Sequence, residues 1–281
     1  VYIQNLIDSG DTSWELAGGN LRADMLDVIE ALQKQNGRYT LETVAPTGER
    51  FYQTISAITQ IIPFDEQLSG LVKLGASADT RIISFTVTEA GYYLDDKDQL
   101  DLNFADLKAD LERVKSGAVG YSIYGAIVTI LKARIANNAG AVTLLNCDNL
   151  RHNGARFRKG LLQFIELLGD AALKTWVEAN TTCPNDMVDR ITPRPTAAVR
   201  ESVLKAALMG ETFIQWVVEE NFIAGRPAWE NVGVEMVKSV TPYEEAKIRI
   251  LNATHSCIAW AGTLRGYTYI HEGTLDGEIR Q

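Results

Sequence analysis

The first half of the chain alternates short apolar, β-branched runs with helical patterns, and this alternation constrains the fold more than any other feature. The apolar runs predict strands at residues 14–21, 39–44, 51–58, 81–89 and 141–146. Helices are predicted between several of these runs, at 24–35, 104–115 and 123–138. Alternating strands and helices form a largely parallel sheet covered by helices. We therefore predict an α/β fold with a doubly wound sheet.

The pattern changes after residue 149, where helical signals follow one another. These helices are predicted at 156–168, 171–180, 211–221 and 242–260. We accordingly expect two domains. The first covers residues 1–231 and joins the α/β sheet to a helical extension, and the second is helical and covers 232–281.

The composition argues against several classes of function. The net charge is −9 and no Lys/Arg cluster is interleaved with aromatic residues, so we expect no nucleic acid partner. No apolar run approaches transmembrane length and no signal peptide is visible, so we expect no membrane. The three cysteines form no Cys-x-x-Cys pair and the three histidines are scattered. We therefore expect no bound metal and a reducing, cytoplasmic location.

A helix start is marked at Thr241. Threonine is a residue type that caps helices, Pro242 suits the first turn, and Glu244 stands three residues after the cap. Glu244 can therefore close a capping box. On its own it is explained as well by capping as by a functional site.

The same helix carries an amine, an amide and an imidazole, on Lys247, Asn252 and His255. At about 100° per residue these three side chains share one broad face with Glu244. Lys247 and His255 are then roughly 12 Å apart along the axis. Apolar neighbours predict that little of the helix faces solvent; they are Ile248, Ile250, Leu251, Cys257, Ile258 and Trp260. We favour a site for a small, elongated, polyhydroxylated ligand, because buried polar groups need partners.

Polar residues also follow two of the predicted strands, where ligands of doubly wound sheets bind. Asn149 comes directly after the strand at 141–146, where the chain should enter the cleft. On residue type alone we favour an Asx turn for Asn149. Glu89 ends the strand predicted at 81–89. The sequence supports two alternatives for it about equally: a solvated strand end or a buried functional carboxylate.

Four stretches carry a resemblance to a known family. They are Thr-Val-Thr-Glu-Ala-Gly-Tyr at 86–92, Asn-Cys-Asp-Asn-Leu-Arg-His-Asn-Gly at 146–154, Cys-Pro-Asn-Asp-Met-Val-Asp-Arg-Ile-Thr-Pro at 183–193, and Lys-x4-Asn-x2-His at 247–255. Through them nearly the whole chain resembles the polyol-specific long-chain dehydrogenases, the mannitol dehydrogenase family. Residues 210–219 and 255–264 are most similar to its D-arabinitol 4-dehydrogenase branch.

The resemblance implies a Rossmann-like dinucleotide-binding domain over 1–231 and the start of a helical substrate and catalytic domain over 232–281. In this family an opening strand and a Gly-x-Gly-x-Phe-His-Arg segment cradle the pyrophosphate, and we expect both before Val1. We expect further helices after Gln281. The chain is therefore expected to be a truncated part of a longer protein.

The resemblance also implies the reaction. It is a metal-independent, NAD-dependent oxidation of a secondary alcohol of a polyol to a ketose. D-arabinitol to D-xylulose is the first choice, mannitol to fructose the second and fructuronate reduction the third. A non-enzyme alternative is a sugar- or nucleotide-binding module that kept the fold and lost turnover. Whether the protein is a monomer or a homo-oligomer is left open.

By the same resemblance Lys247 is the general base that takes the proton of the reacting hydroxyl. An amine with an ordinary pKa of about 10.4 becomes a useful base only when burial lowers that pKa. Asn149 and Asn252 would donate hydrogen bonds to the developing alkoxide. His255 would orient the substrate hydroxyls, and Glu244 would pass the proton from Lys247 to water.

Further residues are implied for the cofactor. Val188 and Asp189 would line the junction between nicotinamide and substrate, and Thr88 would contact the cofactor. Glu89 would contact the substrate or tune Lys247.

Asp24, with Arg22 beside it, follows the first predicted strand. A carboxylate at that position can accept hydrogen bonds from the adenosine ribose and repel a 2′-phosphate, which favours NAD over NADP. The N-cap of the predicted helix at 24–35 explains Asp24 about equally well.

Overall fold

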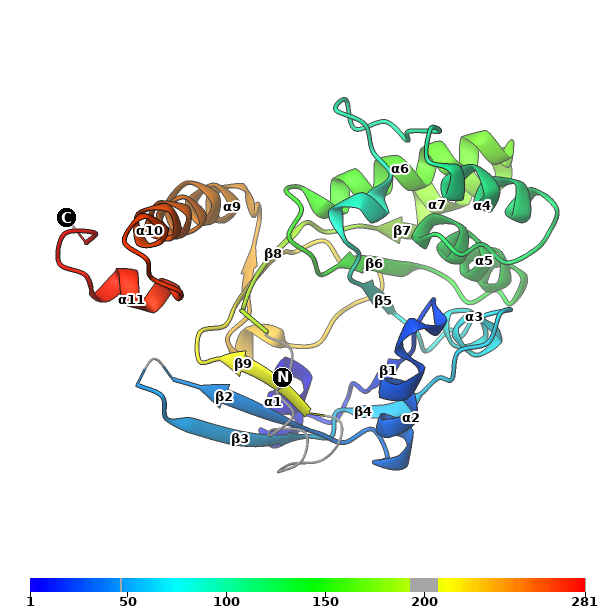
Figure 1. Cartoon of the computed structure of the whole chain (residues 1–281). Coiled ribbons are helices and arrows are strands. Elements are labelled where there is room, and N and C mark those ends of the chain that lie inside the picture. Colours follow the sequence, from blue (N-terminus) through cyan, green and yellow to red (C-terminus); the bar gives the residue numbers. More distant parts are fainter. Residues whose placement is uncertain (46, 193–206, 281) are drawn as a thin grey trace. The chain divides into compact units, whose positions relative to one another are not determined.

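The structure is a computed structural model that describes residues 1–45, 47–192 and 207–280 (Figure 1). It divides into two compact units, Val1–Lys238 and Ser239–Gln281. The α-helices are α1 (Tyr2–Asp8), α2 (Leu26–Lys34), α3 (Ser69–Gly75), α4 (Ala105–Lys115), α5 (Ile123–Ala136), α6 (Asn153–Leu168), α7 (Ala171–Asn180), α9 (Thr241–Ala246), α10 (Ala253–Leu264) and α11 (Ile270–Leu275). Shorter helical turns are η1 (Ala23–Met25), η2 (Glu89–Tyr92) and η3 (Trp229–Val232), and η4 (Lys247–Asn252) is a π-helical stretch.

The strands all belong to the first unit. They are β1 (Leu16–Gly18), β2 (Tyr39–Val44), β3 (Arg50–Ile55), β4 (Ile58–Ile61), β5 (Ile82–Phe85), β6 (Val142–Asn146), β7 (Thr181–Thr182), β8 (Asp186–Asp189), β9 (Ala207–Glu211), β10 (Gln215–Glu219) and β11 (Glu235–Val237). Most of the predicted elements are present, and β2 and α7 have the predicted bounds.

The parallel sheet β5–β6–β7 lies at the centre of the first unit's α/β layers. Every residue of β6 is buried, as expected for a parallel strand that is covered on both faces. Helices α4 to α7 lie on one side of this sheet (Figure 1), and Ile3 and Leu6 of α1 pack with Leu145 of β6 in a second buried cluster. Phe157 and Phe164 of α6 fill the space beside it, and the ring of Phe157 stacks on Tyr124 of α5 with centroids 5.5 Å apart. The core of the α/β layers therefore lies directly beneath the end of β6.

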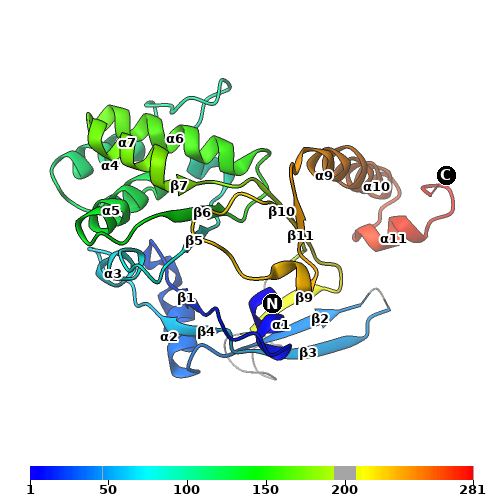
Figure 2. The same ribbon diagram turned by 180° about the vertical axis from the view of Figure 1, so that it is seen from behind.

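Three further small sheets complete the first unit among the described residues. Their orders are β1–β4, β3–β2–β9 and β11–β10–β8 (Figures 1 and 2). The predicted helix at 211–221 is wrong, because β9 ends at Glu211 and β10 occupies Gln215–Glu219. Trp216, Val217 and Val218 are β-formers, and a short apolar run cannot be assigned to helix or strand by periodicity alone.

The second unit contains the helix that was predicted at 242–260. It runs from Thr241 to Leu264 as α9, η4 and α10, and α11 packs against α10. Contrary to the sequence-based expectation, the apolar side chains of this helix are largely exposed; Ile250 and Trp260 are 63% and 75% exposed. Within the second unit α11 contacts α10, and the contact leaves most of these apolar side chains exposed.

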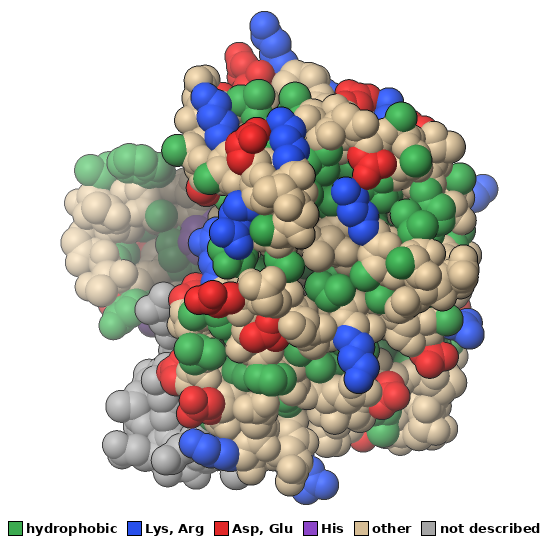
Figure 3. Space-filling model, turned by 90° about the vertical axis from the view of Figure 1, so that its right-hand side faces the viewer, with side chains coloured by type: hydrophobic (Ala, Val, Ile, Leu, Met, Phe, Trp, Pro, Cys, Tyr) green, Lys and Arg blue, Asp and Glu red, His purple; other side chains and the backbone are tan. Residues whose placement is uncertain are grey.

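The surface drawn in Figure 3 carries basic and acidic side chains interspersed rather than gathered by sign. In the part of the chain that the structure describes, no helix has the length and apolar character to cross a membrane. Among the same residues, no group of three or more His, Cys, Asp or Glu side chains is placed to hold a metal ion.

Arg134 of α5 is only 1% exposed. The hydrogen bonds of its guanidinium go to backbone carbonyl oxygens and not to a carboxylate. Its guanidinium donates five hydrogen bonds of 2.7–3.0 Å to backbone carbonyl oxygens, those of Gly75, Ser77, Ala139, Gly140 and Ala141. These carbonyls belong to the end of α3 and to the turn between α5 and β6. Arg134 therefore fixes the start of β6 against two helices.

We predict that Arg134→Met lowers the free energy of unfolding by about 3–5 kcal/mol, because it removes the donors of several buried carbonyl groups. Lys132→Met is the matched control on the same helix. Lys132 is half-exposed and pairs with Asp170 at 3.1 Å, and its loss should cost less than about 1 kcal/mol. Urea unfolding followed by circular dichroism measures both. Equal costs for the two variants would contradict the role of Arg134.

Candidate functional site

The carboxyl end of β6 leads into a short loop that carries Asn149. β6 ends at Asn146, and α6 begins at Asn153. Asp148 is buried, whereas Asn149 is exposed. The Asx-type hydrogen bond of this loop belongs to Asp148, whose Oδ1 accepts from the N–H of Leu150 at 3.4 Å. The predicted turn is therefore present but uses the neighbouring side chain, and Asn149 lies on the loop surface.

Tyr92 connects this loop to the segment after β5. Its hydroxyl donates to Asp148 Oδ2 at 2.6 Å and accepts from Asn146 Nδ2 at 2.6 Å. Burial raises the pKa of Tyr92 far above its ordinary value, so the hydroxyl remains a neutral donor. Burial also raises the pKa of Asp148. Tyr92 thus holds the turn η2 against the end of β6.

Thr88 and Glu89 lie at the start of that turn and are both exposed. The strand predicted to reach Glu89 ends earlier, at Phe85, and Glu89 is an exposed residue of η2 rather than a buried carboxylate. Thr88 occupies the N-cap position of η2 without a side-chain capping bond.

Val188 and Asp189 end β8 and are half-buried. They pair with Trp216 and Gln215 of the antiparallel strand β10. Earlier in β8, Asp186 is 1% exposed and accepts hydrogen bonds from Asn153 Nδ2 at 2.5 Å and from Trp216 Nε1 at 2.7 Å. Burial raises the pKa of Asp186 to about 7.

Asp24 and Arg22 are exposed after β1. Asp24 lies within η1, and neither η1 nor α2 has a side-chain capping bond at its N-terminus. The capping alternative for Asp24 is therefore not observed, which leaves its carboxylate available to a ligand.

A hollow of about 690 Å³ lies beside β1 and β5. Residues of both strands line it, together with Cys147, Trp216 and Trp229. None of the predicted catalytic residues lines this hollow, although Cys147 precedes Asn149 by only two positions. The hollow therefore adjoins the loop of Asn149 without containing it.

In the second unit, the predicted polar residues differ in burial. Glu244 is 4% exposed, Lys247 is half-buried, and Asn252 and His255 are exposed. Thr241 is not the cap, because Val240 occupies the N-cap position, and the N–H of Thr241 donates to Ser239 Oγ at 3.3 Å. Glu244 is thus the fourth residue after the N-cap, whereas the predicted capping box places it third. Pro242 lies in the first turn as predicted.

The π-helical stretch η4 begins at Lys247 and ends at Asn252. A π-helix bonds residue i to i+5, so the angular offsets assumed for a regular α-helix do not apply between these two residues. The prediction that Lys247 and Asn252 share one face assumed about 100° per residue. That angle does not hold through a π-helical stretch. Single turns of π-helix occur often at functional sites. No residue type in this stretch signals the π-turn in the sequence.

Sequence reasoning assigned no role to Tyr92, Asp148, Asn153 and Asp186. All four are polar residues within the stretches 86–92, 146–154 and 183–193, and all four are buried. Polar neighbours surround Asp148, Asn153 and Asp186 in the sequence, so no local pattern distinguishes them as buried.

Comparison with known proteins places these features in a family. The profile described as the mannitol dehydrogenase Rossmann domain matches residues 2–231, and the mannitol dehydrogenase C-terminal domain matches 239–281. D-arabinitol 4-dehydrogenase of Klebsiella pneumoniae is 54% identical over 99% of this chain and 62% of its own length. The enzyme of that name from Ralstonia nicotianae is 56% identical over 95% of this chain and 58% of its own length. The chain thus spans about three-fifths of the length of these relatives.

Two solved structures share the fold. A D-sorbitol dehydrogenase in substrate-free form has a TM-score of 0.88 and 33% identity, and covers 99% of this chain and 59% of that chain. Pseudomonas fluorescens mannitol 2-dehydrogenase, in a ternary complex with NAD and D-mannitol, has a TM-score of 0.86 and 34% identity, with coverage of 99% and 58%. The prediction of a Rossmann-like α/β fold followed by a helical domain is confirmed.

The raised pKa of Asp186 makes a pH dependence testable. Its pKa is about 7 in the folded protein against 3.8 ordinarily, so between these values the folded chain holds a proton that the unfolded chain has released. The contribution of this group to stability is therefore present at low pH and decreases as pH rises from about 4 to about 7. We predict that the stability advantage of the wild type over Asp186→Asn is larger near pH 5 than near pH 8, by about 1 kcal/mol or more. Equal differences at the two pH values in chemical unfolding would contradict the assignment.

Proposed function

The chain belongs to the mannitol dehydrogenase family, and we propose that it acts in an NAD-dependent dehydrogenase that oxidises a secondary hydroxyl of an open-chain polyol to a ketone. One observation carries the proposal. Relatives named D-arabinitol 4-dehydrogenase are 54% and 56% identical to nearly the whole chain. D-arabinitol, with D-xylulose as its product, is therefore the proposed substrate.

Mannitol and fructuronate remain the second and third substrates. Mannitol 2-dehydrogenase of Cereibacter sphaeroides is 36% identical and D-mannonate oxidoreductase of Escherichia coli is 35% identical. These identities are well below those of the D-arabinitol enzymes, which supports the ranking. A binding module without turnover is the non-enzyme alternative, and it would show no substrate-dependent reduction of NAD.

For the cofactor, we propose that residues 1–231 bind NAD and that residues 232–281 begin the substrate domain. NAD, when bound, accepts a hydride from the reacting carbon. The chain fits it at Asp24, an exposed carboxylate after β1 that can accept hydrogen bonds from the ribose hydroxyls. Arg22 lies beside Asp24. Thr88, Val188 and Asp189 are proposed to contact the nicotinamide side. Thr88 lies three residues after β5, and Val188 and Asp189 end β8.

For the chemistry, Lys247 is the proposed general base. Its neutral amine takes the proton of the reacting hydroxyl while the carbon loses its hydride, which leaves a carbonyl group. The amides of Asn149 and Asn252 donate to the oxygen as negative charge develops on it. This assignment needs no metal, because the lysine removes the proton.

The remaining polar groups support these steps. Glu244 lies three residues before Lys247 and is buried; it is proposed to take the proton from Lys247 and to pass it onward to water. His255 is proposed to orient the other substrate hydroxyls. Glu89 is proposed to contact the substrate or tune Lys247 by its charge.

We predict that Lys247→Ala in the full-length enzyme lowers kcat for D-arabinitol by about two to four orders of magnitude, the usual scale for a lost general base. Arg249→Ala is the matched control, because Arg249 lies in the same π-helical stretch, is 73% exposed and pairs with Glu245 at 3.7 Å. NAD reduction measures turnover, and a small external amine should partly restore it in Lys247→Ala. Turnover at the control's rate would show that Lys247 is a solvated residue.

A second prediction concerns Asp24. Relatives in this family differ in cofactor, since a polyol:NADP oxidoreductase of Gluconobacter oxydans is 32% identical to this chain. In the full-length enzyme, Asp24→Ala should shift the kcat/KM ratio of NAD to NADP toward NADP by about tenfold, the effect of about 1.4 kcal/mol, because the ribose acceptor and the repulsion of the 2′-phosphate are both lost. If Asp24→Ala lowers thermal stability but leaves the kcat/KM ratio of NAD to NADP unchanged, Asp24 has a structural role only.

A further inference from the structure

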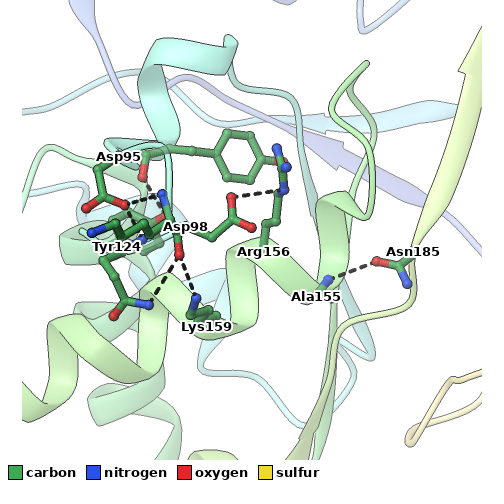
Figure 4. Close-up of polar contacts among 10 residues, drawn as sticks. Asp95, Asp98, Tyr124, Ala155, Arg156, Lys159 and Asn185 are labelled. Carbon is green, nitrogen blue, oxygen red and sulfur yellow. Dashed lines mark hydrogen bonds and ion pairs between the residues drawn. The ribbon is translucent and has the colours of Figure 1, made fainter. Parts of the chain in front are cut away.

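Two of the stretches that identify the family contact each other through residues outside the proposed chemistry. Asn185 and Asp186 at the start of β8 face the first turn of α6. Asn153 Nδ2 donates to Asp186 Oδ1 at 2.5 Å, and the backbone N–H of Asp186 donates back to Asn153 Oδ1 at 3.0 Å. Beside this reciprocal pair, the N–H of Ala155 donates to Asn185 Oδ1 at 2.9 Å (Figure 4). Three hydrogen bonds therefore join the start of α6 to the start of β8.

Asn153 also reaches back across the loop that carries Asn149. Its Nδ2 donates to the carbonyl oxygen of Asp148 at 3.4 Å, and this carbonyl belongs to the peptide bond that leads into Asn149. Asn153 and Asp186 are 0% and 1% exposed, so water does not compete for these bonds. One buried amide thus links the peptide before Asn149 to the strand that ends in Val188 and Asp189.

The backbone at this point leaves no room for adjustment. A Cβ on Gly154 would lie 2.2 Å from the carbonyl oxygen of Pro184 and 2.6 Å from that of Cys183. The main chain of α6 therefore lies directly on the segment that enters β8. Close backbone contact fixes the separation of the two segments, and the Asn153–Asp186 pair fixes their register.

The carboxylate of Asp186 is suited to this role because several donors meet there. Its other oxygen accepts from Trp216 Nε1 at 2.7 Å. A carboxylate has two accepting oxygens, whereas an amide has one. Asparagine at this position would leave one of the two donors facing an NH2 group.

We propose that the Asn153–Asp186 pair positions the Asn149 amide relative to Val188 and Asp189, and so sets the geometry in which the alkoxide is stabilised. Asn153 and Asp186 are positioning residues that touch neither substrate nor cofactor. The inference rests on the proposed function, because the roles of Asn149 and Asp189 do. A displacement of about 1 Å in such a group can cost about a hundredfold in rate.

The test uses the full-length enzyme with Asn153→Ala and Asp186→Asn. Both variants should lower kcat for D-arabinitol about 10- to 100-fold, with KM for NAD changed less than about threefold. Asp110→Asn is the control: Asp110 of α4 is also a buried carboxylate, 3% exposed, and accepts from Ser122 Oγ at 2.5 Å. It should lower stability and leave kcat unchanged. Asn153→Ala retains the Asp186 carboxylate and keeps the test available if Asp186→Asn does not fold.

Coupling to Asn149 separates positioning from general damage. If the pair acts through Asn149, then Asn149→Ala combined with Asn153→Ala should be no slower than Asn149→Ala alone. Multiplicative losses would overturn the proposal and leave the function standing.

A second readout does not need turnover. Amide hydrogen exchange in residues 147–152 should be at least about tenfold faster in Asn153→Ala than in the wild type, with no such change in Asp110→Asn. If the wild type fails to oxidise any polyol, the proposed function fails, and hydrogen exchange still decides whether the pair holds the loop. Unchanged exchange would overturn the proposal.

Discussion

The buried carboxylate of Asp186 is the contact on which the arrangement of the first unit's site depends. It joins β8 to the first turn of α6 through Asn153 and to β10 through Trp216. A charged group in this position is costly unless donors surround it, and burial raises its pKa to about 7. The polar residues Tyr92, Asp148 and Asn146 extend the same buried layer to the turn after β5. Buried hydrogen bonds thus join the turn after β5, the loop after β6 and the strand β8, which are distant in sequence.

The sequence predicted this fold where its signals were local. β2 and α7 have the predicted bounds, and the fully buried strand β6 was recognised from its apolar run. The error at 211–221 has a physical cause: β10 is a strand because Val217 and Val218 pack against other strands, and that tertiary contact leaves no periodic mark in so short a run. The α/β class follows from the alternation of predicted strands and helices along the chain. The strand order of the small sheets does not follow from the sequence and is seen only in the structure.

The sequence indicates candidate site residues by their type, but it does not give their geometry. The polar residues of the helix were identified, but their common face assumed α-helical spacing that η4 interrupts. Thr241 has the residue type of a helix cap, but Val240 occupies the N-cap position. The helix was expected to be buried because its side chains are apolar, but burial also depends on other segments that pack against it. Ile250 and Trp260 are exposed. The Asn153–Asp186 pair joins residues too far apart in sequence for any local rule to connect them.

The proposed catalytic groups are divided between the two units, with Asn149 in the first and Lys247 and Asn252 in the second. The central claim is that they act on one hydroxyl group. A crystal structure of the full-length protein with NAD and D-arabinitol tests it most directly. The account predicts the reacting hydroxyl oxygen within about 3.2 Å of Lys247 Nζ and of both amide nitrogens. A polyol bound by other groups, with Lys247 directed into solvent, would contradict it.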